Sequence, residues 1–560
     1  MTMDESKDSV NSPEPSKSFP KLTPAQIERM KRFGEVRTVA AGDILFEQGA
    51  VDVPFFVLLS CGMEIVQPTE SGERRVVVVH EPGEFTGEVN MLSNRRSLVR
   101  ARVTAPGEVL RISQEKLRSL IQTEPDLSEL IMRAFILRRL YLIEHGHGDA
   151  IVLGSRHCAG TLRVREFLSR NGHPFTYVDL DRDQEAQHLL DRFNVSVDDV
   201  PVLLCRGEYV LRNPSNEEVA ECLGFNTGID NTHVRDVIVV GAGPAGLAAA
   251  VYAASEGLDA LVLETAAPGG QAGSSSRIEN YLGFPTGISG QELAGRAYTQ
   301  ARKFGADIAI AKSAARLTCQ RKPYVIEVRD SEGIQGRTVI IASGAQYNKI
   351  AIPDLAKYEG NGVYYGATFM EAQLCVHEEV VVVGGGNSAG QAAVFLSQTA
   401  SKVHVLVRSR ALAQTMSRYL VRRIEDNPAI DLRTQTEIIG LEGESALERV
   451  VWRNTQTGEE EVRQIRHVFL MTGAIPNTAW LQGCLALDSR GFVKTGNDLS
   501  PDDLSQAGWA LERPPYLLET SLPGVFSVGD VRSGNVKRVA SAVGEGSVAI
   551  HMVHQVLQEQ

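Results

Sequence analysis

The chain has 560 residues and a formal net charge of −12, the composition of a globular protein long enough for about three to five domains. This acidic balance argues against nucleic acid as a main partner, because phosphate backbones attract basic surfaces. No apolar run reaches the ~18 residues of a membrane span, so we expect no membrane partner.

Residues 1–20 are rich in Ser, Pro and charged residues and lack the apolar core of a signal peptide, which predicts a disordered tail. Seven cysteines are scattered along the chain, and none belongs to a Cys-x-x-Cys pair. This spacing favours reduced thiols in the cytoplasm over a disulfide scaffold or a zinc site, so we expect no bound metal.

Residues 21–145 carry short apolar runs separated by glycine turns, which predict a small antiparallel barrel or jelly roll. A helical stretch follows from Gln114, with an interruption near Pro125. Gly42, Gly49, Gly62 and residues 85–92 make this region similar to the cyclic-nucleotide-binding domain family.

That resemblance implies that Gly87 and Glu88 open a phosphate-binding cassette in which the glutamate bonds a ribose hydroxyl. Ser97 stands where the family has its phosphate arginine. The cassette still needs a cation, so the candidate substitutes are Arg95, Arg96 and Arg100. The alternative is a degenerate domain that binds something else or only packs.

Residues 149–225 begin a new unit, in which residues 150–153 and 175–180 read as strands and Cys158 opens an amphipathic helix. Residues 200–204 read as a strand entered through a cis-Pro. The pattern resembles the glutaredoxin/thioredoxin fold, with Thr161 in the place of the resolving cysteine. A helix start beside Arg156 favours a thiolate, so Cys158 is a candidate catalytic residue; the alternative is an inert thiol in a spacer domain.

A strand at residues 236–240 leads into Gly-x-Gly-x-x-Gly and an Ala-rich helix. Gly241 permits the tight turn, Gly243 lets backbone approach a pyrophosphate, and Gly246 lets helix and strand pack closely. The next strand ends in Glu264, an acid that in such units bonds a ribose hydroxyl. We therefore expect a dinucleotide site, which also includes the first helical residues, Pro244 and Ala245.

The same pattern recurs at residues 380–390 as strand, Gly-x-Gly-x-x-Ala and helix. Its candidate binding residues are Gly384, Gly386, Asn387, Ser388 and Ala389. No acid follows the second strand, and Arg408 and Arg410 stand there instead. Arginine forks bind a 2′-phosphate that a carboxylate would repel, which predicts NADP rather than NAD. The alternative is that both arginines are merely solvated.

From about residue 233 to the C-terminus the chain resembles the low-molecular-weight thioredoxin reductase family, in motifs at residues 268–272, 277–285, 342–345, 471–474 and 525–530. The resemblance implies an FAD domain at 233–352 and 480–560, with an NADPH domain at 353–479 inserted between. It also implies that Asp530 bonds the ribityl chain and that Gly529 lies at the flavin phosphates. Further residues expected at FAD or in the crossover turns are Gly270, Gln271, Asn280, Gly344, Gly473, Lys537, Arg538 and Val539.

Thioredoxin reductases place a Cys-x-x-Cys just before the second Rossmann strand, and residues 365–372 contain no cysteine. Cys375 follows, inside an expected helix and without a partner. We therefore expect that the dithiol that receives flavin electrons is missing.

Together these features predict a multidomain protein: a β-barrel or jelly roll, an α/β thioredoxin-like domain and two Rossmann-like α/β domains. We expect a cytoplasmic NADPH-dependent FAD oxidoreductase that is regulated by a ligand of its first domain and, by resemblance, homodimeric. Electrons would leave through a thiol/disulfide or pass directly to a redox protein, as in the ferredoxin or flavodoxin–NADP reductases of this fold. A further alternative is a redox or nucleotide sensor with little turnover.

Overall fold

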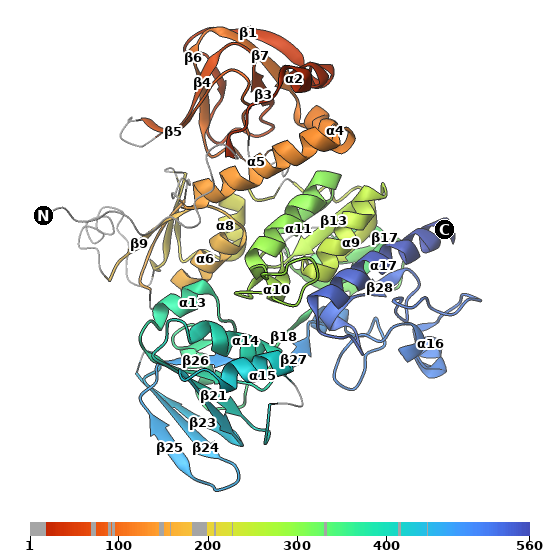
Figure 1. The fold of residues 1–560 in the computed structure, drawn as a ribbon. Coiled ribbons are helices and arrows are strands. Elements are labelled where there is room, and N and C mark those ends of the chain that lie inside the picture. Colours follow the sequence, from red (N-terminus) through yellow and green to blue (C-terminus); the bar gives the residue numbers. More distant parts are fainter. Residues whose placement is uncertain are drawn as a thin grey trace, which may run out of the picture.

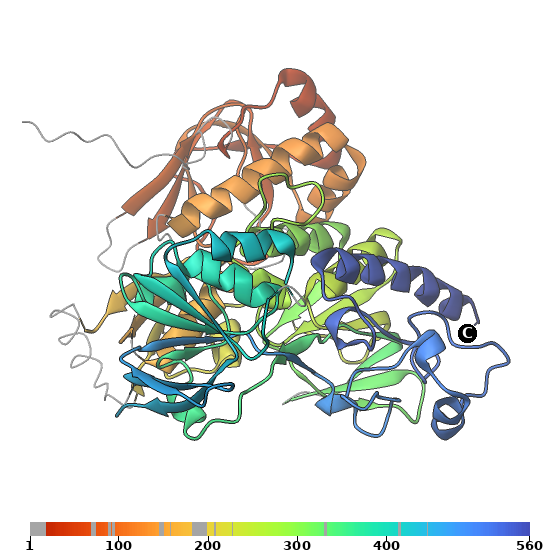
Figure 2. The same ribbon diagram turned by 60° about the horizontal axis from the view of Figure 1, so that its bottom comes forward.

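The computed structural model describes residues 18–559 except 69–73, 88–90, 92–95, 145–149, 157, 182–198, 207–208, 227, 330–332, 413–415 and 445. Within this part, a β-roll module (residues 22–144) lies at one end of the molecule in Figure 1 and Figure 2. A middle module (150–225) follows. The first α/β module is formed by residues 234–347 and 474–559, and the second by residues 363–470.

The β-roll module consists of two antiparallel sheets, in the orders β1-β7-β3 and β2-β6-β4-β5. Its strands are β1 (Glu35–Val39), β2 (Ile44–Phe46), β3 (Phe55–Leu58), β4 (Gly62–Pro68), β5 (Arg74–His80), β6 (Arg100–Ala105) and β7 (Gly107–Ile112). Its helices are α2 (Pro24–Met30), α4 (Gln114–Thr123) and α5 (Pro125–Glu144). Pro125 begins α5, where a missing N–H costs nothing, and this explains the predicted interruption. In the core, the ring of Phe55 lies 5.4 Å from that of Phe85 and 6.2 Å from that of Phe135.

The middle module is a four-stranded sheet in the order β11-β10-β8-β9. Its elements are β8 (Ala150–Gly154), α6 (Ala159–Arg170), β9 (Thr176–Asp179), β10 (Val202–Cys205), β11 (Tyr209–Arg212) and α8 (Asn216–Cys222). β8 and β9 are parallel, whereas β10 is antiparallel to β8. The Val200–Pro201 bond is cis, as the sequence predicts.

The first α/β module is built on a seven-stranded sheet in the order β14-β13-β12-β17-β16-β15, with β28 beside β17. Its strands are β12 (Val234–Val240), β13 (Ala260–Glu264), β14 (Asp307–Ile310), β15 (Ala314–Thr318), β16 (Tyr324–Val328), β17 (Ile334–Ile341) and β28 (Val525–Ser527). Its helices are α9 (Pro244–Ser255), α10 (Gly270–Gly273), α11 (Gly290–Phe304), α16 (Pro501–Ala507) and α17 (Val539–Glu559).

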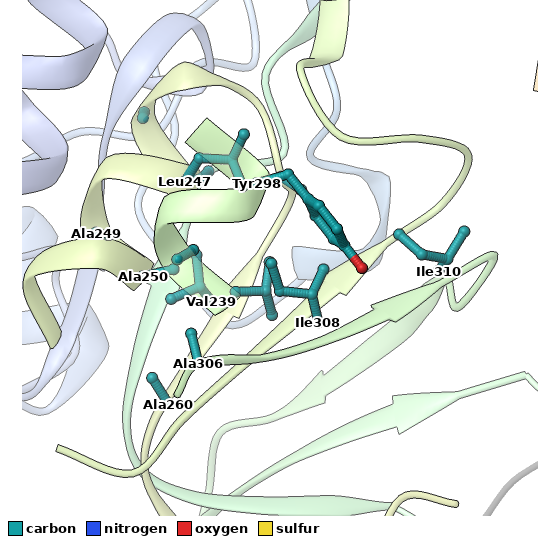
Figure 3. Packing of buried hydrophobic residues seen from close by; sticks show 14 of the residues in the cluster. Val239, Leu247, Ala249, Ala250, Ala260, Tyr298, Ala306, Ile308 and Ile310 are labelled. Atoms are coloured by element: carbon teal, nitrogen blue, oxygen red, sulfur yellow. The ribbon is translucent and has the colours of Figure 1, made fainter. Parts of the chain in front are cut away.

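Small side chains let α9 approach this sheet closely. Ala249 and Ala250 are fully buried in one cluster with Val239 of β12 (Figure 3). Ile308 and Tyr298 belong to the same cluster and come from β14 and α11. Parallel strands that are covered by helices read as continuous apolar runs, which is why the sequence reveals β12 and β13.

The second α/β module has a parallel sheet in the order β19-β26-β20-β21-β22 and a three-stranded antiparallel sheet, β23-β24-β25. The parallel strands are β19 (Val363–Tyr364), β20 (Glu379–Val383), β21 (Lys402–Val407), β22 (Ile430–Thr434) and β26 (His467–Leu470). The others are β23 (Thr436–Glu442), β24 (Arg449–Asn454) and β25 (Glu460–Arg463). The helices are α13 (Phe369–Leu374), α14 (Asn387–Leu396) and α15 (Arg418–Glu425). A ribbon of β18 (Ala345–Tyr347) and β27 (Ala474–Pro476) joins the two α/β modules.

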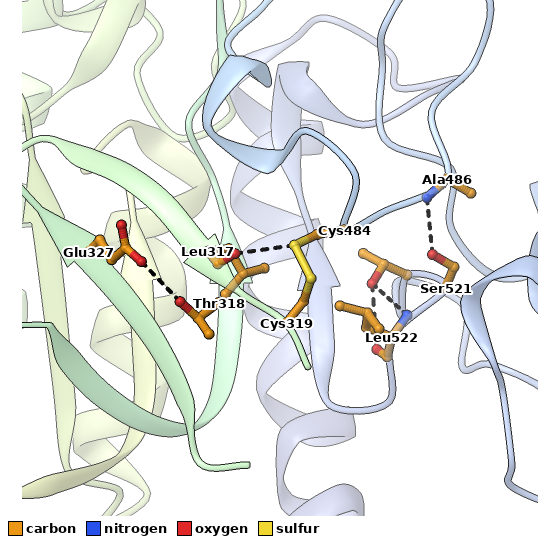
Figure 4. The surroundings of a disulfide bond; sticks show 9 residues. Leu317, Thr318, Cys319, Glu327, Cys484, Ala486, Ser521 and Leu522 are labelled. Atoms are coloured by element: carbon orange, nitrogen blue, oxygen red, sulfur yellow. Dashed lines mark hydrogen bonds between the residues drawn. A yellow bond between two sulfur atoms is a disulfide. The ribbon is translucent and has the colours of Figure 1, made fainter. Parts of the chain in front are cut away.

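Four cysteines form disulfides, so the expectation that the cysteines are unpaired is wrong for them. Cys205 pairs with Cys222 in the middle module, and Cys319 pairs with Cys484. The second bond joins the two sequence-distant halves of the first α/β module (Figure 4). These partners are 17 and 165 residues apart, so no local spacing reveals them; only the folded chain brings them together. Among the described helices, none is long and apolar enough to cross a bilayer.

Candidate functional site

In the first glycine-rich turn, two of the three glycines pack tightly against backbone atoms and the third faces open space. Gly241 has φ +107°, and a Cβ there would lie 2.3 Å from the carbonyl oxygen of Ala342. A Cβ on Gly246 would lie 1.8 Å from the carbonyl oxygen of Gly241, so α9 packs directly on the turn. At Gly243, the nearest atom to such a Cβ is the Cα of Gly270, at 4.0 Å. The start of α9 therefore has room for a phosphate at its free N–H groups.

Glu264 ends β13 and links the first turn to the next loop. Its Oε2 accepts a hydrogen bond from Ala242 N at 2.8 Å, and its Oε1 accepts from Ala266 N at 2.9 Å, Ala267 N at 3.2 Å and Thr265 Oγ1 at 3.4 Å. The side chain is buried, and because each carboxylate oxygen has about two acceptor positions, Oε2 retains one for a hydroxyl. This position suits the expected ribose contact.

The second glycine-rich turn has the same geometry. Gly384 has φ +145°, and a Cβ there would lie 2.4 Å from Met471 O, whereas Gly386 faces open space. Ala389 is buried at the third position. Asn387 Oδ1 accepts a hydrogen bond from Ser417 N at 2.8 Å, so its side chain orders the loop before α15.

Arg408 and Arg410 follow β21 directly and are exposed. In the described part of the chain, neither forms an ion pair with a carboxylate. Their guanidinium groups are thus available to an anionic ligand at the end of the strand, where the predicted 2′-phosphate would lie.

The turn at Gly529 and Asp530 lies against the start of α9. A Cβ on Gly529 would lie 3.0 Å from the Cβ of Ala245, and Gly529 N donates to Glu545 Oε2 at 2.7 Å. Burial raises the pKa of the Asp530 carboxyl, and the charge of Lys537 opposes this shift. Lys537 and Arg538 are exposed just before α17, which begins at Val539.

The two crossover turns lie side by side. Asn477 N donates to Gly344 O at 3.0 Å, and Thr472 Oγ1 donates to Asn348 O at 2.6 Å. Gly344 has φ +65° with open space at its Cβ position, and the backbone of Gly473 also has positive φ. The ribbon therefore brings both motifs to the boundary between the α/β modules.

A cavity of about 550 Å³ lies at that boundary. Two of the predicted residues line it, Gln271 and Ser388, whereas Asn280 is exposed and does not. Lining residues outside the predicted set include Arg277, Tyr347, Tyr365 and Gln391. Tyr347 is hydrogen-bonded to Ser388, and burial raises its pKa. Only its position beside a crossover turn could have indicated Tyr347 in advance.

The segment at which the sequence leads us to expect the family dithiol forms one wall of this cavity. Tyr365, Gly366 and Ala367 line it, and Tyr365 Oη donates to Glu359 Oε1 at 2.7 Å. Cys375 lies one residue after α13 and not inside it, because the helix ends at Leu374. Its thiol is buried and donates to Glu371 O at 3.3 Å, and burial raises its pKa to about 12.

Cys158 is the N-cap residue of α6 and is half-buried, with Sγ 3.8 Å from Val200 O. Thr161 is fully buried and points at Gly154, so it lies in the core of the module and not at the surface beside Cys158.

Helix α6 contacts both α/β modules. Near its start, Leu162 packs against the core of the second α/β module. Ala159 lies so close to Gly360, just before that module, that a Cβ on Gly360 would lie 2.8 Å from the Cβ of Ala159. At its end, Arg170 Nη2 donates to Gly270 O at 2.9 Å and Asn171 Nδ2 donates to Ala266 O at 3.1 Å.

The β-roll also contains a cavity, and Gly87, with φ +109°, lines it. Glu88 and Arg95 lie outside the described residues. Arg96 and Arg100 do not line the cavity: Arg96 Nη1 donates to Gly49 O at 3.4 Å, and Arg100 pairs with Glu47 at 2.5 Å. The structure therefore does not bring these two candidate cations to Gly87.

Two sequence families match separate parts of the chain. Residues 235–546 match pyridine nucleotide-disulphide oxidoreductase, and residues 36–124 match the cyclic nucleotide-binding domain. The chain belongs to the pyridine nucleotide-disulphide oxidoreductase family and carries a cyclic nucleotide-binding domain at its N-terminal side.

Within that family the chain is thioredoxin-reductase-like. It is 32% identical to thioredoxin reductase of Bacillus subtilis (strain 168) over 328 residues, which cover 58% of this chain and 96% of that protein. It is 34% identical to the Mycolicibacterium smegmatis enzyme, covering 58% and 98%. The crystal structure of Lactococcus lactis thioredoxin reductase in the FR conformation is similar, with TM-score 0.52, 27% identity and coverage of 58% and 100%. The thioredoxin reductase family uses FAD and NADPH, and the open glycine turns here fit both.

Proposed function

We propose that this chain is an NADPH-dependent flavin oxidoreductase that passes electrons to a thiol/disulfide or protein acceptor without a Cys-x-x-Cys dithiol beside the flavin. The cavity between the α/β modules carries the proposal. It brings Gln271 and Ser388 together with the wall at Tyr365–Ala367, and none of its described lining residues is a cysteine.

Two separate sets of residues would bind the two nucleotides. The start of α9, Glu264 and the turn at Asp530 would hold FAD, and the start of α14 with Arg408 and Arg410 would hold NADPH. Bound FAD would supply hydride acceptance from NADPH and electron release to the acceptor. Tyr347, fixed by Ser388, would help to shape the wall where the two rings meet.

This proposal includes two alternative routes, called exits here, by which electrons leave the flavin for the acceptor. Cys158 lies in a module that we propose to be thioredoxin-like. Its thiol would attack a disulfide of the acceptor, release one acceptor thiol and form a mixed disulfide, which two electrons from bound FAD would then reduce in cis to Cys158 and the second acceptor thiol. The other exit is direct transfer to a redox protein, which the cysteine-free wall at Gly366 favours. Because α6 is tied to both α/β modules, the first exit requires those contacts to break.

We also propose that a small effector of the β-roll regulates the reductase, and that the protein is a homodimer, as the family resemblance implies. Helix α4 supplies a physical connection for such regulation. Gln114 at its start lines the β-roll cavity, and near its end Gln122 Nε2 donates to Lys303 O of α11 at 3.5 Å.

Anaerobic stopped-flow reduction by NADPH, followed by turnover with thioredoxin, glutathione disulfide, ferredoxin, quinone and O₂, tests the proposal. We expect rapid flavin reduction and one preferred acceptor. Cys158→Ser separates the two exits, and Cys375→Ser is the matched buried control. Loss of turnover only in Cys158→Ser supports the exit in cis, and equal rates in both variants support direct transfer. A protein that binds no FAD, or whose flavin NADPH does not reduce, contradicts the proposal.

A further inference from the structure

The two α/β modules are joined to one another by the narrow crossover ribbon, in which β18 pairs with β27 over three residues. A two-stranded ribbon is marginally stable by itself, so it fixes the orientation of the modules only weakly. An ion pair between Arg423 and Glu279 at 3.0 Å also links them. Both modules supply walls to the cavity of about 550 Å³, so the shape of this cavity depends on how they are oriented.

The middle module and the first α/β module share one buried core. Val164 and Phe167 of α6 belong to the same cluster as Ala242 and Tyr298 of the first α/β module. Phe225 is in this cluster too, and its ring lies 5.8 Å from that of Phe167. Because the apolar surfaces that meet here are withdrawn from water, the two modules form one packed unit.

Hydrogen bonds reinforce this junction. Asn226 Nδ2 donates to Ile310 O, and Asn226 Oδ1 accepts from Ile310 N, both at 2.7 Å. These bonds add to those that Arg170 and Asn171 donate to the first α/β module. The middle module therefore has a fixed position relative to the first α/β module.

The opposite face of α6 meets the second α/β module. Ala159, Leu162 and Glu166 share this face, because residues three or four apart lie together on a helix. Leu162 packs against the buried cluster of the second module. Burial raises the pKa of Glu371 in α13, and the charge of Glu166 adds to this shift, so the two carboxyls lie near one another across the interface. One side of α6 is thus in the core of the packed unit, and the other side rests on the second α/β module.

The start of α6 also supports the wall of the cavity. Gly360 has φ +79°, and a Cβ on it would lie 2.8 Å from the Cβ of Ala159. Its neighbour Glu359 accepts from Tyr365 Oη at 2.7 Å and pairs with Lys349 at 2.6 Å. Tyr365 and Lys349 both line the cavity. Helix α6 is therefore connected to two side chains of the wall through a single turn.

We propose that helix α6 is a positioning element for hydride transfer: it holds the second α/β module against the first, and Leu162 and Gly360 are the positioning residues at this contact. The inference rests on the proposed function, in which one hydride passes from NADPH to FAD and, with a proton from solvent, yields NADP⁺ and FADH₂. A misplacement of about 1 Å slows such a step by about 100-fold. Other residues would bind the nucleotides, so loss of these contacts should slow transfer more than it weakens binding.

Anaerobic stopped-flow reduction of the full chain tests this proposal with Leu162→Ala. We expect the limiting rate of flavin reduction to fall about 10-fold or more, while the NADPH concentration for half-maximal rate changes less than about 2-fold. The long-wavelength charge-transfer absorbance of the NADPH complex, which reports stacked rings, should fall as well. Leu211→Ala is the matched control, because Leu211 is a partly buried leucine of the same module that packs against the other cluster. Hydrogen exchange of the FAD-free protein at residues 358–362 is a readout without turnover, and it should be faster only in Leu162→Ala.

Gly360→Ala, with and without Ala159→Gly, is a second test that does not depend on Leu162. The added methyl group should push α6 away and slow flavin reduction, and Ala159→Gly removes the methyl group that it meets. We expect the double variant to recover most of the lost rate, whereas backbone strain at Gly360 alone would leave reduction slow.

Normal flavin reduction in both Leu162→Ala and Gly360→Ala, or no recovery in the double variant, overturns this inference. A wild-type protein whose flavin NADPH does not reduce contradicts the proposed function instead. Unchanged hydrogen exchange at residues 358–362 in Leu162→Ala overturns the attachment of α6 whether or not the flavin is reduced.

Discussion

Arg170 Nη2 donates to the carbonyl oxygen of Gly270 at 2.9 Å, which ties helix α6, whose N-cap residue is Cys158, to the loop expected along FAD. Gln291 Nε2 donates to Ser169 O at 2.8 Å beside it. At the other end of the helix, Ala159 contacts Gly360 before the second α/β module. One helix of the middle module thus contacts both sides of the boundary between the two α/β modules.

Removal of the Arg170 side chain should loosen this attachment. Arg170→Ala leaves Gly270 O without its donor, at a cost of about 1–3 kcal/mol in docking free energy. We expect faster hydrogen exchange at residues 266–273 and weaker FAD retention, both measurable on the full chain. Glu166→Ala is the control, because it removes the other partner of Arg170 and keeps the Gly270 contact. Unchanged exchange at residues 266–273 would argue against the attachment.

Asp530 should strengthen FAD binding, but its charge should destabilise the protein when FAD is absent. Asp530→Asn should weaken FAD binding by about 10–100-fold if the carboxylate accepts a ribityl hydroxyl, as measured from the flavin-to-protein absorbance ratio after dialysis. Asp502→Ala, in exposed α16, is the control.

The same variant should have the opposite effect on the apoprotein. The pKa of Asp530 is raised in the fold, so stability is lost as the pH rises from the pKa of the unfolded carboxyl through the higher folded value. Asp530→Asn should therefore raise the Tm of the apoprotein at neutral pH, and the gain should vanish at acidic pH below the unfolded pKa, where the carboxyl is protonated in both states. A Tm gain that does not change with pH would contradict this account.

Arg408 and Arg410 should set the preference for NADPH over NADH. Each charge-assisted bond to a 2′-phosphate contributes about 1.5–3 kcal/mol, so removing both should weaken NADPH binding by at least about 100-fold. NADH has no 2′-phosphate, and its binding should change little. Stopped-flow flavin reduction at varied nucleotide concentration measures both, with exposed Arg422→Ala of α15 as the control. An equal loss of affinity for NADPH and NADH would show that the arginines maintain the shape of the site and do not contact the 2′-phosphate.

Cys158 should react with iodoacetamide much faster than Cys375. The thiolate is the nucleophile, and with a pKa of about 12 only about 10⁻⁵ of Cys375 is ionised at pH 7. Cys375 is also fully buried, whereas Cys158 is half-exposed at a helix start. Mass spectrometry of the alkylated protein measures both rates. Cys61 serves as a second buried thiol, because burial raises its pKa as well. Equal labelling of Cys158 and Cys375 would mean that Cys158 is inert.

The sequence alone predicts both glycine-rich turns, because each depends on a few adjacent residues. Gly241 and Gly384 adopt positive φ where the pattern requires it, and the strands before them are continuous apolar runs. Cys158 at a helix start and the cis bond before Pro201 follow from equally local patterns. In each case the physical cause acts over a few neighbouring residues, through backbone sterics or strand burial.

Only the tertiary structure decides which distant groups meet. The Cys319–Cys484 bond joins strand and loop across 165 residues. Arg138 reads in the sequence as one of several charged residues on a helix, yet the fold buries it against Gly87 and Phe85. Arg96 and Arg100, the expected cations, contact other partners instead. Side-chain burial and pairing depend on long-range packing that has no short sequence period, so these contacts form only when the chain is folded.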